Sequence, residues 1–189
     1  MIEWFGLESI GKSAARFDYA KLENLNGHYM RHTADDALLE AFLAFLPHAE
    51  GGPELLSQID SPMRAKLLRS LAGLKERAKT LVELKNSANY LFAVRPLAID
   101  DKARSLLDEA GRAVLANLLP VLAGAEWSAA ALEAAVKAYA EAQGVKLGKL
   151  AQPIRAALTG TSTSPGIFDV LEVLGRDEAL ERIGDQAGV

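Results

Sequence analysis

The sequence contains no cysteine in its 189 residues. Disulfide bonds and thiolate metal sites are therefore excluded, which fits a reducing compartment such as the cytoplasm. The three histidines, His28, His32 and His48, lack the carboxylate-rich spacing of a zinc site, so we expect no bound metal. Neither a signal peptide nor the roughly 20 apolar residues that span a bilayer can be found. We expect a soluble, cytoplasmic protein that does not contact membranes.

Aromatic residues are also scarce, at 6% of the chain, although 50% of the residues are hydrophobic. The core must therefore consist mainly of leucine, alanine, valine and isoleucine. Alanine and leucine lose little conformational freedom in helices, which favours helical structure. No segment shows a convincing alternation of apolar and polar residues, which is typical of half-buried strands. The sequence predicts an all-α protein.

Helix boundaries are marked by capping residues and by proline. Thr33, with Asp36 in a capping box, is predicted to start a helix that runs to Pro47. Ser61 and Pro62 are predicted to start a long helix that continues through Leu81. The buried side of that helix would leave three cations on other faces, Lys75, Arg77 and Lys79.

Further helices are predicted after Asp100, over 112–122 and over 128–143, where Gly144 ends the helix. Residues 147–158 are also predicted to be helical, and Pro153 either kinks that helix or marks its start. Two shorter helices follow, one after Ser164-Pro165 and one capped by Asp177.

The first 32 residues differ from the rest, because their aromatic content is higher and their apolar spacing is less regular. Asn26-Gly27 is a typical turn signal. We interpret residues 1–32 as a small mixed connecting segment. It precedes a helical bundle or cage of two subdomains, 33–125 and 126–189.

Residues 6–13, GLESIGKS, match the phosphate-binding pattern G-x-x-x-x-G-K-[ST]. That pattern binds phosphate only where a strand leads into the loop and a helix leaves it. Only five residues precede Gly6, and no further strands are predicted downstream. We therefore treat the match as accidental, and a nucleotide hydrolase that uses Lys12 is a weak hypothesis.

The formal net charge of −4 disfavours nucleic acid as a partner, but the charges are unevenly distributed. Residues 61–95 carry eight cations and two acids, and residues 144–168 carry three cations and no acid. Residues 33–60 carry six acids and neither lysine nor arginine. A polyanion responds to local charge, because screening acts over about 8–10 Å. Helices that simply face water are an equally simple interpretation.

Two segments resemble a known family. Residues 16–31, RFDYAKLENLNGHYMR, are similar to F-D-x-x-K-L-x-x-x-N-G-x-Y-[IM]-R, which joins the two halves of bacterial glutamyl-tRNA synthetases. Residues 144–168, GVKLGKLAQPIRAALTGTSTSPGIF, resemble G-x-K-L-G-x-x-x-Q-P-[IL]-R-x-A-[LV]-T-G…[ST]-P-G-[IL]-F in the helical half of those enzymes. The resemblance extends from Trp4 to Ile183, in the same order.

The resemblance implies that this chain is the anticodon-binding part of an enzyme that joins glutamate to its tRNA. The two ATP-binding signatures of class I synthetases, His-Ile-Gly-His and Lys-Met-Ser-Lys-Ser, do not occur here. ATP and Mg²⁺ would bind the catalytic half, so we expect this chain to be inactive and to hold no cofactor. Its expected partner is glutamate tRNA, and the resemblance leaves open whether glutamine tRNA is also accepted. We expect a monomer that does not bind DNA.

The resemblance also assigns residues to parts of the tRNA. Arg77 aligns with the family arginine that recognises the last anticodon base. The residues that would meet the other anticodon bases are Arg155, Ser164, Pro165, Gly166, Ile167 and Phe168. Contacts to the tRNA backbone and stem would come from Lys21, Asn26, Gly27, Tyr29, Arg31, Lys146 and Lys149.

The chemistry of arginine suits the proposed contact with cytosine. Cytosine presents two adjacent acceptors, O2 and N3, to which a guanidinium can donate in a bidentate manner. Uracil would instead point its own N3–H at the arginine and lose the pair. The competing hypothesis is a helical protein-interaction domain without RNA binding, because its amphipathic helices would show a similar pattern.

Overall fold

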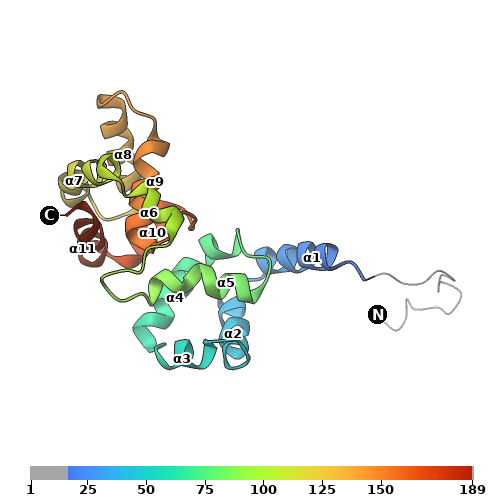
Figure 1. The fold of residues 1–189 in the computed structure, drawn as a ribbon. Coiled ribbons are helices and arrows are strands. Elements are labelled where there is room, and N and C mark those ends of the chain that lie inside the picture. The colour runs from blue at the N-terminus through green and yellow to red at the C-terminus, as the bar shows by residue number, and fades with distance from the viewer. Residues whose placement is uncertain (1–16, 189) are drawn as a thin grey trace, which may run out of the picture.

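The computed structural model describes residues 17–188, which form α-helices and short 3-10 turns without any strand (Figure 1). The all-α prediction is confirmed for these residues. The P-loop match at residues 6–13 lies outside them. The elements are α1 (Tyr19–His32), α2 (Asp35–Phe45), η3 (Leu46–His48), α3 (Gly52–Ser57), α4 (Ser61–Lys75), α5 (Leu81–Ala88), η4 (Asn89–Leu91), α6 (Asp101–Leu106), α7 (Glu109–Gly124), α8 (Ala129–Ala142), α9 (Leu147–Thr159), α10 (Ile167–Leu174) and α11 (Arg176–Ala187).

Short polar side chains cap many of these helices. Such a side chain accepts a hydrogen bond from a backbone N–H group that has no partner within the first turn. Asp100 and Ser128, which mark the predicted starts of two helices, do this for α6 and α8. Gly144 follows α8 with a φ of 63°, in the left-handed conformation that suits glycine at a helix end. Pro153 lies inside α9, so it does not mark the start of that helix.

Four local predictions of helix boundaries were wrong. Asp177 does not cap α11, because it lies within the first turn of that helix, which begins after Gly175. Thr33 does not cap α2, because it ends α1, where its hydroxyl donates to Tyr29 O at 2.8 Å. Asp60, rather than Ser61, caps α4. The long helix predicted from Ser61 through Leu81 is broken by the non-helical residues 76–80, because Thr80 caps a new helix, α5.

The described part of the connecting segment is helix α1, and Asn26 and Gly27 lie within it rather than in a turn. Tertiary contacts explain why these two residues are helical here. Asn26 Nδ2 donates to Lys79 O at 2.5 Å. A Cβ atom on Gly27 would lie 3.3 Å from the Cα atom of Lys79, so the small residue lets α1 pack closely against the 76–80 loop.

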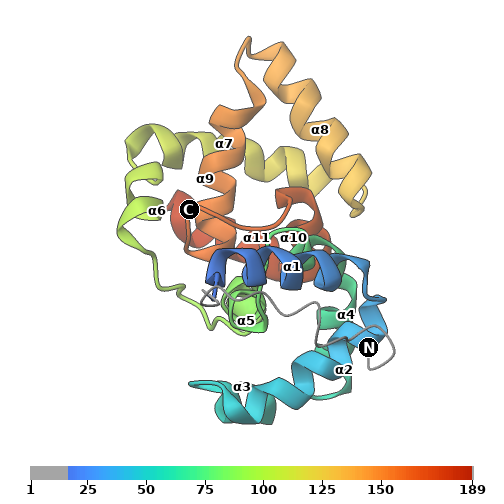
Figure 2. The ribbon, with the colours of Figure 1, turned by 90° about the vertical axis from the view of Figure 1, so that its right-hand side faces the viewer.

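The helices pack in two groups, which Figures 1 and 2 show as the lower and upper parts of the molecule. One group comprises α1 to α5, and the other comprises α6 to α11. Helix α7, which the predicted boundary at residue 125 assigned to the first subdomain, packs against α9 and α11. One hydrophobic cluster, from Met30 to Ile183, runs through both groups, and the subdomain division at that boundary stays a prediction.

A buried arginine links the two groups. The side chain of Arg182, on α11, is only 2% exposed. Its guanidinium donates to Leu158 O at 2.7 Å in the second group and to Tyr90 O at 2.9 Å in the first. It also donates to Ala93 O at 3.1 Å, and Glu178 Oε1 accepts from its Nε at 2.6 Å. A direct contact between α4 and α10 completes the junction.

We predict that Arg182→Met strongly destabilises the protein. Methionine has a similar length but leaves three carbonyl oxygens and a carboxylate without their donor. Breaking a buried charged interaction of this kind costs roughly 3–5 kcal/mol. Urea denaturation followed by circular dichroism measures this loss in the free energy of unfolding.

The control is Arg95→Met, which removes an arginine that pairs with Glu181 and Asp185 on the same helix. This pair is exposed to solvent, so we expect a much smaller effect. Equal urea midpoints for the two variants would contradict the role assigned to Arg182.

Candidate nucleic-acid interface

A cleft of about 400 Å³ lies between the two helix groups and contains several of the predicted site residues. We call it the arginine cleft. It is lined by Leu74, Arg77, Ser87, Thr163, Ser164 and Pro165. Arg77 and Ser164 are far apart in the sequence, but the contact between α4 and α10 brings their segments together. The structure therefore places Arg77 at the surface, on the side of the predicted 164–168 pocket.

Arg77 stands on the loop between α4 and α5, and several contacts hold this loop. Thr80 caps α5 by accepting from Glu83 N at 3.1 Å, and Glu83 Oε2 accepts in turn from Lys79 N at 2.6 Å. On the other side of the loop, Asn26 binds Lys79 O. These contacts fix the backbone after Arg77, and the Arg77 N–H donates to Leu74 O at 3.2 Å, while the side chain of Arg77 is exposed.

Arg155 brings a second guanidinium close to the same cleft. Its Nε donates to Ser164 Oγ at 3.0 Å, and Ser164 Oγ donates to Pro165 O at 2.9 Å. Burial, and then the nearby charge of Arg77, lower the pKa of Arg155 from its ordinary value. Arginine stays protonated in proteins, so two positive charges lie near each other. The terminal nitrogens of Arg155 stay free of Ser164.

Not every residue of the predicted 164–168 pocket is available to a ligand. Ser164 is buried, and its hydroxyl is engaged with Arg155. Ile167 is 5% exposed and belongs to the hydrophobic core, so its side chain does not present a surface on which a base can stack. Phe168 is half-buried against that core, and Gly166 is exposed at the start of α10.

The residues predicted to contact the tRNA backbone and stem lie outside the arginine cleft. Lys146 immediately precedes α9, and Lys149 is in the first turn of that helix, about 9 Å along the helix axis from Arg155. Both lysines are exposed. The remaining residues are on α1, where Lys21 and Tyr29 are exposed and Arg31 is partly buried.

The prediction that all three cations of the long helix lie away from its buried side is wrong for Lys75. Its side chain is only 15% exposed. Its Nζ lies 2.7 Å from Asp35 Oδ1 and donates to Thr33 O at 2.9 Å. Lys75 thus fastens α4 to the junction of α1 and α2, and it is not free to bind a ligand.

Hydroxyl and amide groups that the sequence did not reveal also surround the cleft. A smaller adjoining cleft of about 180 Å³ is lined by Asn86, Ser87, Tyr90, Thr159, Thr161, Thr163 and Ser164. Thr161 Oγ1 donates to Thr163 O at 2.6 Å, which stabilises the loop after α9. The local sequence around Asn86 and Ser87 does not indicate that they line a cleft, because only tertiary packing brings α5 to this loop.

The arginine cleft therefore offers fixed positive charge and neutral hydrogen-bonding groups. None of its six lining residues is acidic. Guanidinium groups donate to phosphate oxygens and to the acceptor edges of bases, and hydroxyls both donate and accept. In the part of the chain that the structure describes, no three histidine, aspartate or glutamate side chains are grouped to hold a metal ion. Likewise, none of the described helices is long and apolar enough to cross a membrane.

Comparisons with known proteins agree on one family. Residues 37–187 match the family described as "Anticodon binding domain". Glutamate–tRNA ligase 2 of Brucella ovis and its counterpart in Brucella canis are each 61% identical to this chain over 189 residues. The matches cover 100% of this chain, which spans about 40% of the length of these curated relatives.

Two solved structures share the fold. The glutamate–tRNA ligase of Elizabethkingia meningosepticum, solved in complex with its amino acid, superposes with a TM-score of 0.79 at 24% identity. It covers 98% of this chain, which matches 35% of that protein. The glutamate–tRNA synthetase of Elizabethkingia anophelis gives a TM-score of 0.72 at 25% identity, with 98% and 34% coverage. The resemblance found in the sequence is thereby confirmed.

We predict that Ser164→Ala releases Arg155 from its fixed orientation. Removing the acceptor leaves Arg155 Nε without its side-chain partner, which costs about 1 kcal/mol of folding free energy. Urea denaturation measures that loss, and the NMR signal of the Arg155 Nε–H group should shift. Thr163→Val is the control, because the side chain of Thr163 lines the cleft without holding Arg155. An unchanged Arg155 signal in Ser164→Ala would contradict the positioning role.

Proposed function

The chain belongs to the anticodon-binding domain family, and we propose that it is the tRNA-binding part of a glutamate–tRNA ligase. The observation that carries this proposal is the position of Arg77, which is exposed in a cationic cleft beside Arg155 and the 164–168 segment. The identity of 61% to glutamate–tRNA ligases of Brucella supports the choice of amino acid. On this proposal the partner is glutamate tRNA.

Arg77 would recognise the last base of the anticodon, a cytosine. RNA sequence is recognised best on unstacked bases, whose Watson–Crick edges are free to pair with side chains. The exposed guanidinium of Arg77 would donate to cytosine O2 and N3, and Ser87 and Thr163 stand beside it to contact the same or a neighbouring nucleotide. A bidentate contact of this kind contributes about 1–3 kcal/mol of discrimination, by analogy with DNA.

Arg155 would contact another part of the anticodon through its terminal nitrogens, which form no hydrogen bond with residues 17–188. In this proposal Ser164 acts by orienting Arg155, while Pro165 lines the cleft and Gly166 follows it at the start of α10. The exposed cations Lys21, Lys146 and Lys149 would contact phosphates of the tRNA outside the cleft. Phosphate contacts add affinity that falls with salt and does not depend on sequence.

The activity of the longer protein is part of the same proposal. Its other part would bind ATP, Mg²⁺ and glutamate and form glutamyl-tRNA, whereas the present chain would bind tRNA without catalysing a reaction. We propose a cytoplasmic monomer. An arginine at position 77 favours glutamate tRNA over glutamine tRNA as the substrate.

We predict that Arg77→Ala weakens binding of glutamate tRNA by about 1–3 kcal/mol, which is roughly 5- to 150-fold, because the bidentate contact is lost. Filter-binding titrations at fixed salt measure this, with glutamate tRNA and with a form that carries uracil at the last anticodon position. Wild type should prefer the cytosine form, and Arg77→Ala should bind both forms equally.

Arg77→Lys separates charge from recognition. A lysine keeps the positive charge but lacks the planar fork, so it should retain part of the affinity and lose the preference for cytosine. Lys102→Ala, which removes an exposed cation on α6, is the control and should keep that preference. Equal binding of both tRNAs by wild type, unaffected by Arg77→Ala, would instead favour a protein-interaction domain.

A further inference from the structure

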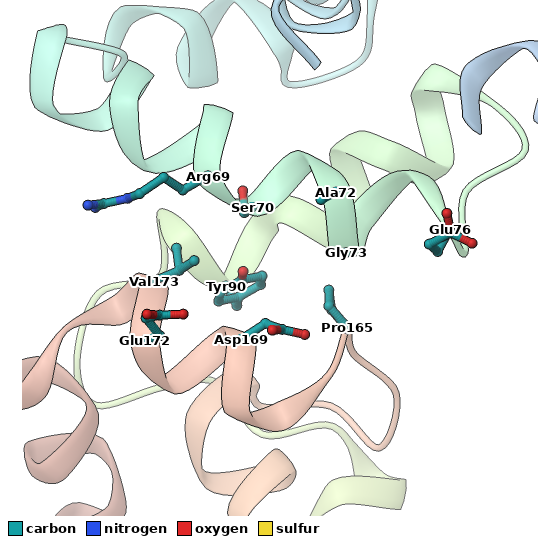
Figure 3. A pocket seen from close by; sticks show the side chains of 10 residues that line it. All are labelled: Arg69, Ser70, Ala72, Gly73, Glu76, Tyr90, Pro165, Asp169, Glu172 and Val173. Carbon is teal, nitrogen blue, oxygen red and sulfur yellow. The ribbon is translucent and has the colours of Figure 1, made fainter. Parts of the chain in front are cut away.

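A second and larger cleft, of about 590 Å³, lies between α4 and α10 (Figure 3). It shares Pro165 with the arginine cleft but has the opposite charge. Three carboxylates line it: Glu76 from the end of α4, and Asp169 and Glu172 from α10. We call it the acidic cleft. The proposed binding of tRNA does not use these carboxylates, since they would repel phosphate.

Tyr90 provides a buried polar group in the acidic cleft. Its side chain lines the cleft between the two helices, as Figure 3 shows, and the residue is only 5% exposed. Its backbone is held in place, because its carbonyl oxygen accepts from Arg182. The hydroxyl, in contrast, forms no hydrogen bond with another group of residues 17–188, and although the ring is buried, the hydroxyl oxygen is not fully enclosed by protein. A ligand in the cleft can therefore reach this oxygen, which can both donate and accept a hydrogen bond.

The electrostatics of the cleft favour a positive ligand. Burial, followed by the charges of Glu172 and Glu133, raises the pKa of Asp169 above its ordinary value. Burial, and then the charge of Asp169, also raise the pKa of Tyr90, so its hydroxyl stays protonated. Within residues 17–188, none of the three carboxylates lies within 4.0 Å of a cationic group.

One cation does border the acidic cleft, but it does not neutralise the carboxylates. Arg69, on α4, extends away from Asp169 in Figure 3. It forms no ion pair with a described carboxylate. Its guanidinium therefore leaves the negative charge at the α10 side uncompensated.

The walls restrict the shape of the ligand. Ala72, Pro165 and Val173 supply apolar surface between the polar groups. An ammonium group presents three donors, which suit carboxylate oxygens and the lone pairs of a tyrosine oxygen. A short methylene stem would then lie against the apolar walls.

We propose that the acidic cleft binds a protonated primary amine on an aliphatic stem, held by Asp169, Glu172 and the hydroxyl of Tyr90. The amine is either a free aliphatic amine or a lysine side chain, which share this chemistry. The site is separate from the arginine cleft, so tRNA binding and amine binding can succeed or fail independently.

The test is a titration of the 189-residue chain with n-butylammonium, n-butanol and butyrate, which share one stem but differ in charge. Two-dimensional ¹H–¹⁵N NMR should show shifts of the Gly73 and Val173 amides with n-butylammonium, at a dissociation constant on the order of millimolar. Equal shifts with n-butanol, or equal shifts at the acidic start of α2, would overturn the proposal.

Variants test the individual groups. Tyr90→Phe and Asp169→Asn should each weaken n-butylammonium binding roughly tenfold, because each loses a charge-assisted hydrogen bond. Glu141→Gln removes an exposed carboxylate on α8 and should leave binding unchanged. Tyr90→Phe keeps the buried ring, so it stays informative where Asp169→Asn is poorly folded. Unchanged affinity in Tyr90→Phe would refute the assigned role of the hydroxyl.

Two further ligands separate the sources of the amine. Spermidine represents a free amine, and Nα-acetyl-lysine methylamide represents a lysine in a peptide. Tighter binding of either one, at the same amides, supports the site and identifies its natural source. If neither of these ligands nor n-butylammonium binds, the proposed amine site is rejected, and the outcome of the tRNA titrations is unaffected.

Discussion

The geometry of the two clefts depends on the guanidinium of Arg182. The arginine cleft takes Arg77 and Ser87 from one helix group and Ser164 from the other, so any shift between the groups would change its shape. Arg182 binds carbonyl oxygens from both groups at once. Arginine is suited to this role because its five donors have a fixed planar arrangement. A lysine of similar reach would offer one flexible point of attachment instead.

Local charge, rather than total charge, distinguishes the two clefts. The chain carries a formal net charge of −4, yet the arginine cleft has two guanidinium groups close to it and no acidic lining residue. On the other side of Pro165, the acidic cleft carries three carboxylates. Such a boundary confines a polyanion to the side of the arginine cleft. A phosphate group is attracted by the guanidinium groups there and is repelled by the carboxylates on the other side. On the proposed function, these carboxylates would thus help to define where a tRNA lies.

The sequence predicted the features that depend on neighbouring residues and missed those that depend on distant ones. The helix starts at Asp100 and Ser128 and the helix end at Gly144 depend on residues within one helical turn, and they were predicted correctly. Asn26-Gly27 looked like a turn because its contact with Lys79, 53 residues away, is invisible in the sequence. Ser87 was missed as a site residue for the same reason. The family resemblance identified Arg77 and Arg155 as site residues, but it did not reveal that Ile167 is buried.

The connection between α1 and the arginine cleft follows from these same long-range contacts. An exposed arginine on a free loop would lose much side-chain and backbone entropy when it binds a base, which would reduce its discrimination. Here the capping of α5 by Thr80 holds one end of the 76–80 loop, and α1 holds the preceding residue, Lys79, through Asn26 and the close approach of Gly27. Helix α1 therefore contributes to the cleft without lining it. Its Asn26 and Gly27, which resemblance alone assigned to the tRNA, already have a structural role in positioning Arg77.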